Sequence, residues 1–209
     1  MKKFLFIAFL CWIHFVFPFQ IFGLNSQIFK IEQDTRWNPK TNVYSDFKNG
    51  FSWSFPPLDW EISSGTERHT IFKVVESKTK LTVFVNVNPI TTSKNPPADI
   101  FLIYDKLVSM ENMLESQVEK VTGAKIIENS RKKTKFAGKN AIKRRYITKM
   151  EDDRYEKPLQ VLAITYTFIY NNATWSISIK CYKEIYDYLM SQDYNIEEIF
   201  KGFQFIHIN

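Results

Sequence analysis

Alternating hydrophobic and polar residues mark the first β-strand that the chain predicts. Phe51, Trp53 and Phe55 are separated by serines, so the three aromatic side chains point to one face of an extended segment. Pro56 and Pro57 end this strand, because neither proline can donate a ladder hydrogen bond. Large rings on one face of a strand need a covering layer, and we expect the rest of the chain to supply it.

Further stretches have the alternation or the β-branched composition of strands. They cover residues 69–75, 81–87, 125–128, 140–150, 159–170, 174–181 and 203–206. Short loops join the first strands along the chain, which predicts an antiparallel meander. Hairpin turns are expected at 136–139 and at Asn171–Asn172, since asparagine tolerates positive φ. Residues 27–48 are polar, and we expect them to be irregular.

Hydrophobic residues at steps of three or four predict an amphipathic helix of roughly 20 residues. The apolar stripe consists of Ile100, Ile103, Leu107, Met110, Leu114 and Val118. Asp99 suits the helix start and Gly123 its end. Glu111, Glu115 and Glu119 are expected largely off the stripe. A second helix is predicted over residues 184–201, with an interruption near 191–193.

The N-terminus has the pattern of a secretory signal. Lys2 and Lys3 precede the apolar run 4–17, and cleavage is expected after Ser26. The apolar run is long enough that an uncleaved membrane anchor is the alternative. We therefore predict a signal peptide at residues 1–26, a single globular domain at 27–209, and an exported protein, periplasmic or secreted. Membrane contact is expected only if the signal remains attached.

Charge and cysteine content narrow the possible functions. The formal net charge of +6 falls when Lys2 and Lys3 are removed, and this mildly basic balance does not indicate a nucleic-acid partner. Cys181 is the one cysteine of the predicted mature chain, so an internal disulfide and a cysteine-based metal site are excluded. Cys181 shares an apolar row with Ile177 and Ile179, which predicts an inert buried thiol.

Catalytic patterns are weak in this chain. His69 and His207 are too few and too far apart for most zinc sites. The stretch 50–54 resembles a nucleophile elbow, but Ser54 replaces the second glycine and Pro56 replaces the following helix. We assign no catalytic residue, cofactor or metal ligand, and we predict that the protein is not an enzyme. A hydrolase that uses His69 is a minor alternative.

A basic run between residues 131 and 145 contains eight cations and no acid. A surface patch for an acidic protein, anionic lipid heads or a polyanionic glycan is one interpretation. The other is a solvated hairpin whose charge is balanced by acids between 151 and 156. The candidate patch residues are Lys135, Lys139, Lys143, Arg144 and Arg145.

The order of these elements resembles the PsbP-like superfamily over about residues 45–206. The matching stretches are 50–56 with Trp60, 136–141 before the strand that carries Tyr146, Asn171–Asn172 with 175–177, and 200–205. The superfamily includes an extrinsic subunit of photosystem II, a Ran-binding nuclear import factor and many exported bacterial proteins.

The resemblance implies an α+β fold in which an antiparallel sheet lies between helices, an α/β/α sandwich. Characterised members mostly dock onto protein partners, so it also implies a binding or accessory role through a macromolecular partner. A small-molecule or lipid-binding module, with a pocket between helix and sheet, is the alternative. No functional residue is transferred from the family.

Overall fold

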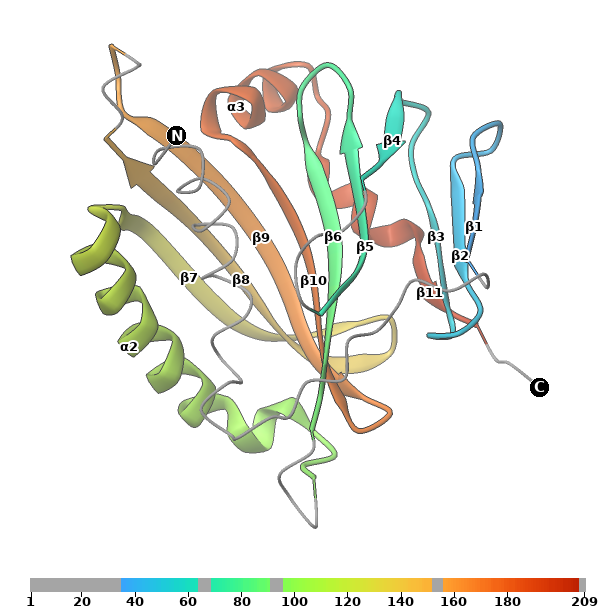
Figure 1. Ribbon diagram of the computed structural model, residues 1–209, viewed down its shortest axis with the longest axis horizontal. Helices are drawn as coiled ribbons and strands as arrows, with labels where there is room; N and C mark the ends of the chain where they lie inside the picture. The colour runs from blue at the N-terminus through green and yellow to red at the C-terminus, as the bar shows by residue number, and fades with distance from the viewer. Residues whose placement is uncertain (1–34, 64–68, 91–95, 152–155, 207–209) are drawn as a thin grey trace.

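The computed structural model describes residues 35–63, 69–90, 96–151 and 156–206 (Figure 1). The predicted signal at residues 1–26, His207 and the acids at 152 and 153 lie outside the described residues.

Most of the strands form one antiparallel sheet, which we call the large sheet. Its strand order is β4-β5-β6-β10-β9-β8-β7. The strands are β4 (Trp60–Ile62), β5 (Thr70–Glu76), β6 (Thr82–Pro89), β7 (Lys125–Phe136), β8 (Lys139–Met150), β9 (Leu159–Tyr170) and β10 (Ala173–Tyr182). Both predicted hairpin turns are confirmed: Ala137–Gly138 and Asn171–Asn172 have positive φ at both residues, as two-residue hairpins with the right twist require.

A second antiparallel sheet, the small sheet, has the order β1-β2-β3-β11. Its strands are β1 (Thr35–Asn38), β2 (Val43–Asp46), β3 (Phe51–Ser54) and β11 (Phe203–Phe205). Two predictions were therefore wrong. Residues 27–48 contain β1 and β2 rather than only irregular chain. The aromatic strand β3 pairs with β2 and β11, and the meander consists of β4, β5 and β6 instead.

The prolines after β3 explain this change of sheet. The chain turns at Pro56, whose carbonyl accepts a hydrogen bond of 2.9 Å from Trp60 Nε1. Residues beyond the turn form β4, which takes the place beside β5 that β3 was expected to occupy.

The long predicted helix is confirmed, with a 3₁₀ first turn. It consists of η1 (Ile100–Ile103) and α2 (Tyr104–Thr122). Asp99 Oδ1 accepts a hydrogen bond of 2.9 Å from the Phe101 amide, and Gly123 ends the helix at φ 71°. The second predicted helix is split, as expected, into α3 (Lys183–Ser191) and η2 (Ile196–Gly202), with Asp193 at φ 58° between them.

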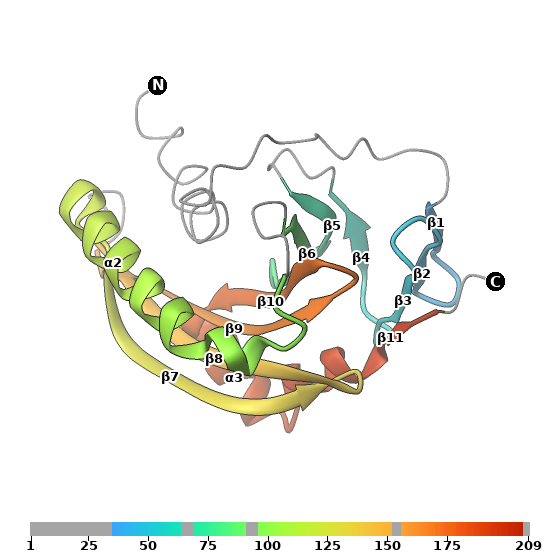
Figure 2. The same ribbon diagram turned by 90° about the horizontal axis from the view of Figure 1, so that it is seen from below.

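The large sheet is the middle of three layers (Figure 2). Helix α2 lies on one face, over β7 and β8. The opposite face is covered by α3, η2 and the small sheet. The α+β class is confirmed, but the predicted sandwich of one sheet between helices is only partly correct, because one outer layer contains a sheet as well as helices.

The main core lies between the two sheets. Phe51 and Trp53 have no exposed surface and contact Phe203, with ring centroids 5.4 Å apart in each pair. Trp53 Nε1 also donates to the Ile199 carbonyl at 2.8 Å, which attaches η2 to β3. Burial of an aromatic side chain of this size contributes about 1.5–3 kcal/mol. The prediction that the rest of the chain covers the aromatic rings of this strand is confirmed.

Candidate functional site

The basic run lies on the hairpin of β7 and β8, where successive side chains alternate between the two faces of the large sheet. Lys143 and Arg145 are on the face that carries the core residues Ile164 and Ile147. Arg144 is on the opposite face, toward α2. We call this second face the α2 face. Of the five predicted patch residues, Lys143 and Arg145 therefore share one face, and Arg144 lies on the other.

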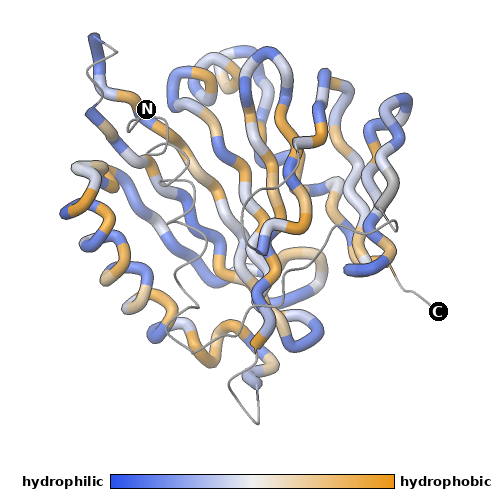
Figure 3. The backbone as a smooth tube through the Cα atoms, viewed as in Figure 1, coloured by the Kyte–Doolittle hydropathy of each residue, from blue (hydrophilic) through white to orange (hydrophobic). Residues whose placement is uncertain are grey.

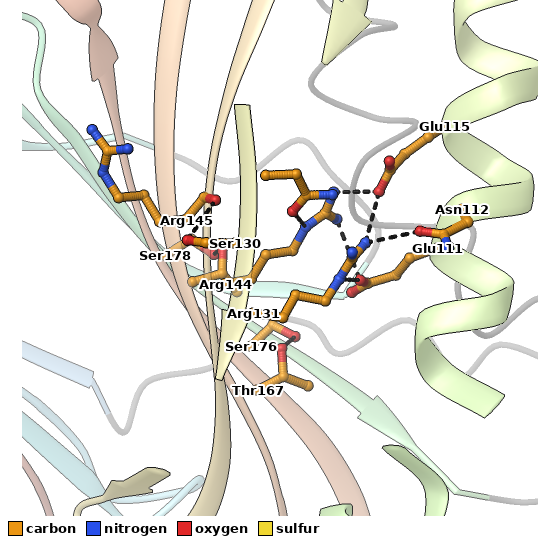
Figure 4. Close-up of polar contacts among 12 residues, drawn as sticks. Glu111, Asn112, Glu115, Ser130, Arg131, Arg144, Arg145, Thr167, Ser176 and Ser178 are labelled. Carbon is orange, nitrogen blue, oxygen red and sulfur yellow. Dashed lines mark hydrogen bonds and ion pairs between the residues drawn. The ribbon is translucent and has the colours of Figure 1, made fainter. Parts of the chain in front are cut away.

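Arg144 belongs to a compact ionic cluster with α2 (Figure 4). Arg131 lies directly across the strand pair from Arg144. Arg131 donates from Nε to Glu111 at 2.8 Å and from Nη2 to Glu115 at 3.0 Å. Arg144 pairs with Glu115 and lies 3.5 Å from Glu111. We call these four residues the arginine–glutamate cluster. It binds the helix to the edge of the large sheet.

This cluster was not predicted from the sequence, where Glu111 and Glu115 were expected only to lie largely off the apolar stripe of the helix. Leu107, Leu114 and Val118 are buried as predicted. The two glutamates occupy the same side of the helix, since residues three and four apart lie above one another. A signal was available in the sequence: acids at this spacing, followed by a strand hairpin rich in arginine.

Lys143 and Arg145 are also paired, on the other face. Lys143 forms an ion pair with Glu197 of η2, and its ammonium lies 5.7 Å from the Tyr166 ring centroid. Arg145 pairs with Glu128 at 3.0 Å and lies over Tyr186 of α3. These cations hold the short C-terminal helices against β8, which is a structural role.

The remaining four cations of the basic run differ in the contacts of their ammonium groups. Lys133 lies 4.8 Å from the Tyr104 ring centroid, and Lys139 lies 4.7 Å from that of Tyr170. Lys132 and Lys135 are exposed, and their ammonium groups contact neither an acid nor an aromatic ring of the described residues. Both lie on β7, an edge strand that is mostly hydrophilic (Figure 3).

The α2 face is polar across the middle of the large sheet, although it is buried there. Cross-strand neighbours on β9 and β10 are joined by hydroxyl contacts, at 2.9 Å between Thr165 and Ser178 and at 3.4 Å between Thr167 and Ser176. Asn86 of β6 continues this polar region opposite Ser176. A small apolar cluster lies beside it under η1 and α2. It consists of Ile100, Leu107, Ile142 and Ile169.

The remaining candidate residues within the described ranges are Cys181 and His69. Cys181 is buried, and burial raises the pKa of its thiol to about 12, so the group stays protonated at neutral pH. His69 directly precedes β5 and has φ 73°. No three His, Cys, Asp or Glu side chains of the described residues are grouped so that they could hold a metal ion. No helix within the described ranges has the length and apolar character to span a membrane.

No protein-family model and no curated protein matches the chain. Among solved structures, the chain is similar to cyanobacterial PsbP (CyanoP) from Synechocystis sp. PCC 6803, with 13% identity, a TM-score of 0.49, and coverage of 88% of this chain and 99% of that one. The Saccharomyces cerevisiae Ran-binding protein Mog1p has 9% identity and a TM-score of 0.44, over 84% and 97% of the two chains. LpqN, involved in cell envelope biogenesis of Mycobacterium tuberculosis, has 12% identity and a TM-score of 0.42, over 75% and 83%. PsbP-like proteins, to which the sequence was expected to be similar, are among these structures.

Proposed function

We propose that the protein is an exported, non-catalytic binding protein that recognises an acidic macromolecular partner at the edge of its large sheet. The observation that carries this proposal is the state of Lys132 and Lys135, which are exposed on β7 and have no charged partner among the described residues. A cation that is already paired must lose its partner before it can bind another acid. Lys132 and Lys135 can accept an acidic group without that cost.

Lys139 lies on the same face as Lys132, across the hairpin from Phe136 and next to the turn at Ala137–Gly138. Lys135 points to the α2 face, so the proposed contact follows the edge of the sheet rather than one of its faces. Lys143, Arg144 and Arg145 are excluded from the proposed contact, because each is engaged with an acid of the protein itself. The proposed contact therefore consists of Lys132, Lys135 and Lys139.

Lysines on an edge strand also have a protective role, since they discourage pairing with a strand of another chain. The two roles predict different effects when the charge of these lysines is reversed. A lost partner contact lowers binding, whereas a lost protective charge promotes self-association. Both can be measured on the same variant.

The test is affinity capture from an envelope extract by three forms of the protein. They are the wild type, the double variant Lys132→Glu and Lys135→Glu, and the control Lys40→Glu and Lys157→Glu. The control has the same change in net charge on exposed lysines, one between β1 and β2 and one before β9. We expect a specific partner with the wild type and the control, and about tenfold less with the β7 variant.

Two further measurements complete this test. Binding to the captured partner is expected to weaken as salt rises, because the contact is between exposed charges. Vesicles of phosphatidylglycerol, compared with phosphatidylcholine, show whether anionic lipid suffices. Equal capture by all three forms would contradict the proposed surface. Hydrolysis of p-nitrophenyl acetate that disappears in His69→Ala would contradict a non-catalytic role.

Export is proposed from the N-terminal sequence. The mature protein is then expected to begin at Gln27 and to comprise residues 27–209 as one domain. N-terminal sequencing of protein recovered from the envelope or medium checks this expectation. A mature chain that keeps residues 1–26 would indicate the membrane anchor instead.

A further inference from the structure

Three side chains on the α2 face carry buried polar atoms that have no hydrogen-bond partner among the described residues. They are Asn86 Nδ2, Asn88 Oδ1 and Thr174 Oγ1. The residues are 1%, 3% and 0% exposed. Folded proteins pair nearly all such groups, so several unpaired ones close together need an explanation.

The strand register brings these atoms together. Asn86 and Asn88 are two residues apart on β6, so their side chains share a face. Thr174 of β10 lies directly opposite Asn88. Cross-strand neighbours of this kind have Cβ atoms about 4.5–5.5 Å apart. The register therefore groups these three side chains in one small area of the α2 face.

The orientation of Asn86 is fixed by a neighbour on the other side. Its Oδ1 accepts a hydrogen bond of 2.6 Å from Thr70 Oγ1, which leaves Nδ2 as the unpaired donor. The three residues thus offer one amide donor, one amide acceptor and one hydroxyl, which can act as either.

The residues around this group restrict the chemical class of the ligand. None of the three residues is charged, and the guanidinium of Arg144 on the same face is neutralised by Glu115. An adjacent donor and acceptor match the C=O and N–H of an amide. Ile169 lies opposite Thr174 and belongs to the apolar cluster under η1, so apolar side chains border the three polar ones.

We propose that Asn86, Asn88 and Thr174 form a binding site for an uncharged ligand that carries a secondary amide. Asn86 Nδ2 donates to the ligand carbonyl, and Asn88 Oδ1 accepts from the ligand N–H. The Thr174 hydroxyl bonds to whichever group lies next to the amide. The site is independent of the charged surface on β7, so each can fail without the other.

An N-acetylated sugar and a peptide-like amide both supply this chemistry. The test is a titration followed by the side-chain amide signals of Asn86 and Asn88 in ¹⁵N–¹H NMR spectra. The probes are N-acetylglucosamine and N-acetylalanine methylamide, with glucose as the control that lacks an amide. Saturable shifts of these signals with an amide probe, and none with glucose, support the site. The probe that binds more tightly identifies the source of the amide.

The variant Thr174→Val provides a second readout. It removes an unpaired buried hydroxyl with little change in shape, so we expect the ligand-free melting temperature to rise by about 2–4 °C. The affinity for the amide probe should fall about fivefold or more. The matched control is Thr165→Val on the same face, where the hydroxyl is paired with Ser178 and the melting temperature should fall.

Two results would overturn the proposal. The first is the absence of saturable shifts with both amide probes. The second is a fall in melting temperature for Thr174→Val equal to that of Thr165→Val, which would mean that the hydroxyl is satisfied by structural water.

Discussion

The substitution Glu115→Gln tests whether the arginine–glutamate cluster holds α2 to the large sheet. Glu115 accepts from Arg131 Nη2 at 3.0 Å and from Arg144. Glutamine has nearly the same shape and helix propensity, so the change removes the charge with little effect on packing. The two arginines, neighbours across the strand pair, then share Glu111 as their remaining acid in the cluster.

The magnitude follows from the burial of these side chains. Removing one partner of a fully buried ion pair costs about 3–5 kcal/mol. The four side chains of the cluster are 10–19% exposed, so solvent screens part of this effect. A charge-assisted hydrogen bond contributes about 1.5–3 kcal/mol, and Glu115 accepts more than one. We therefore expect a loss of about 2–3 kcal/mol in the free energy of unfolding.

Urea unfolding measured by circular dichroism provides the assay, with the midpoint compared at constant m-value. The matched control is Glu119→Gln, which changes the same residue type on the same helix. Glu119 pairs with Lys125 at 3.4 Å, and both side chains are about half exposed or more. That pair should contribute less than about 1 kcal/mol. Equal effects of the two substitutions would refute a structural role for the cluster.

Two further predictions concern packing and the buried thiol. Gly202→Ala places a β-carbon 1.8 Å from the Ser54 carbonyl oxygen, a backbone atom that cannot move cheaply, and should cost about 3 kcal/mol in urea unfolding. Gly123→Ala, at φ 71° with no atom within 4 Å of the added carbon, should cost only about 1 kcal/mol; a larger loss than at Gly202 would contradict the close contact. Burial raises the pKa of the Cys181 thiol from 9.0 to about 12, so native protein lacking residues 1–26 should react slowly with Ellman's reagent at pH 8 and quickly in guanidinium. Because the folded-state pKa of this thiol is raised, its contribution to the free energy of unfolding is fully present below the unfolded value of about 9. The contribution is lost as pH rises from about 9 toward 12, which urea midpoints across that range can check.

Elements with a strong period were predictable from the sequence. The strand β9 has the predicted bounds, because a run of apolar and β-branched residues ends at the asparagine turn. Helix α2 was found from its apolar stripe and its terminal glycine. In both cases, local propensity, pattern and turn chemistry favour the same structure.

Short or highly charged strands were not predictable in the same way. Only residues 125–128 of β7 were expected, although the strand continues to Phe136. The basic residues between have no hydrophobic alternation, and the strand forms because β8 pairs with it along its length. Strands β1 and β2 have four residues each and depend on tertiary contacts, such as the Tyr44 ring stacked 4.0 Å from Phe72.

The candidate sites show the same division between local and tertiary information. Strand alternation alone could have separated Arg144 from Lys143 and Arg145. It could not have shown that Arg144 meets Glu115, a residue on another element 29 positions away. A sequence tells which side chains are polar, but only the fold determines which of them are paired. Two groups of polar atoms are therefore informative, because contacts among the described residues do not account for them: the lysines of β7 that lack an acidic partner, and the unpaired amide and hydroxyl atoms on the α2 face.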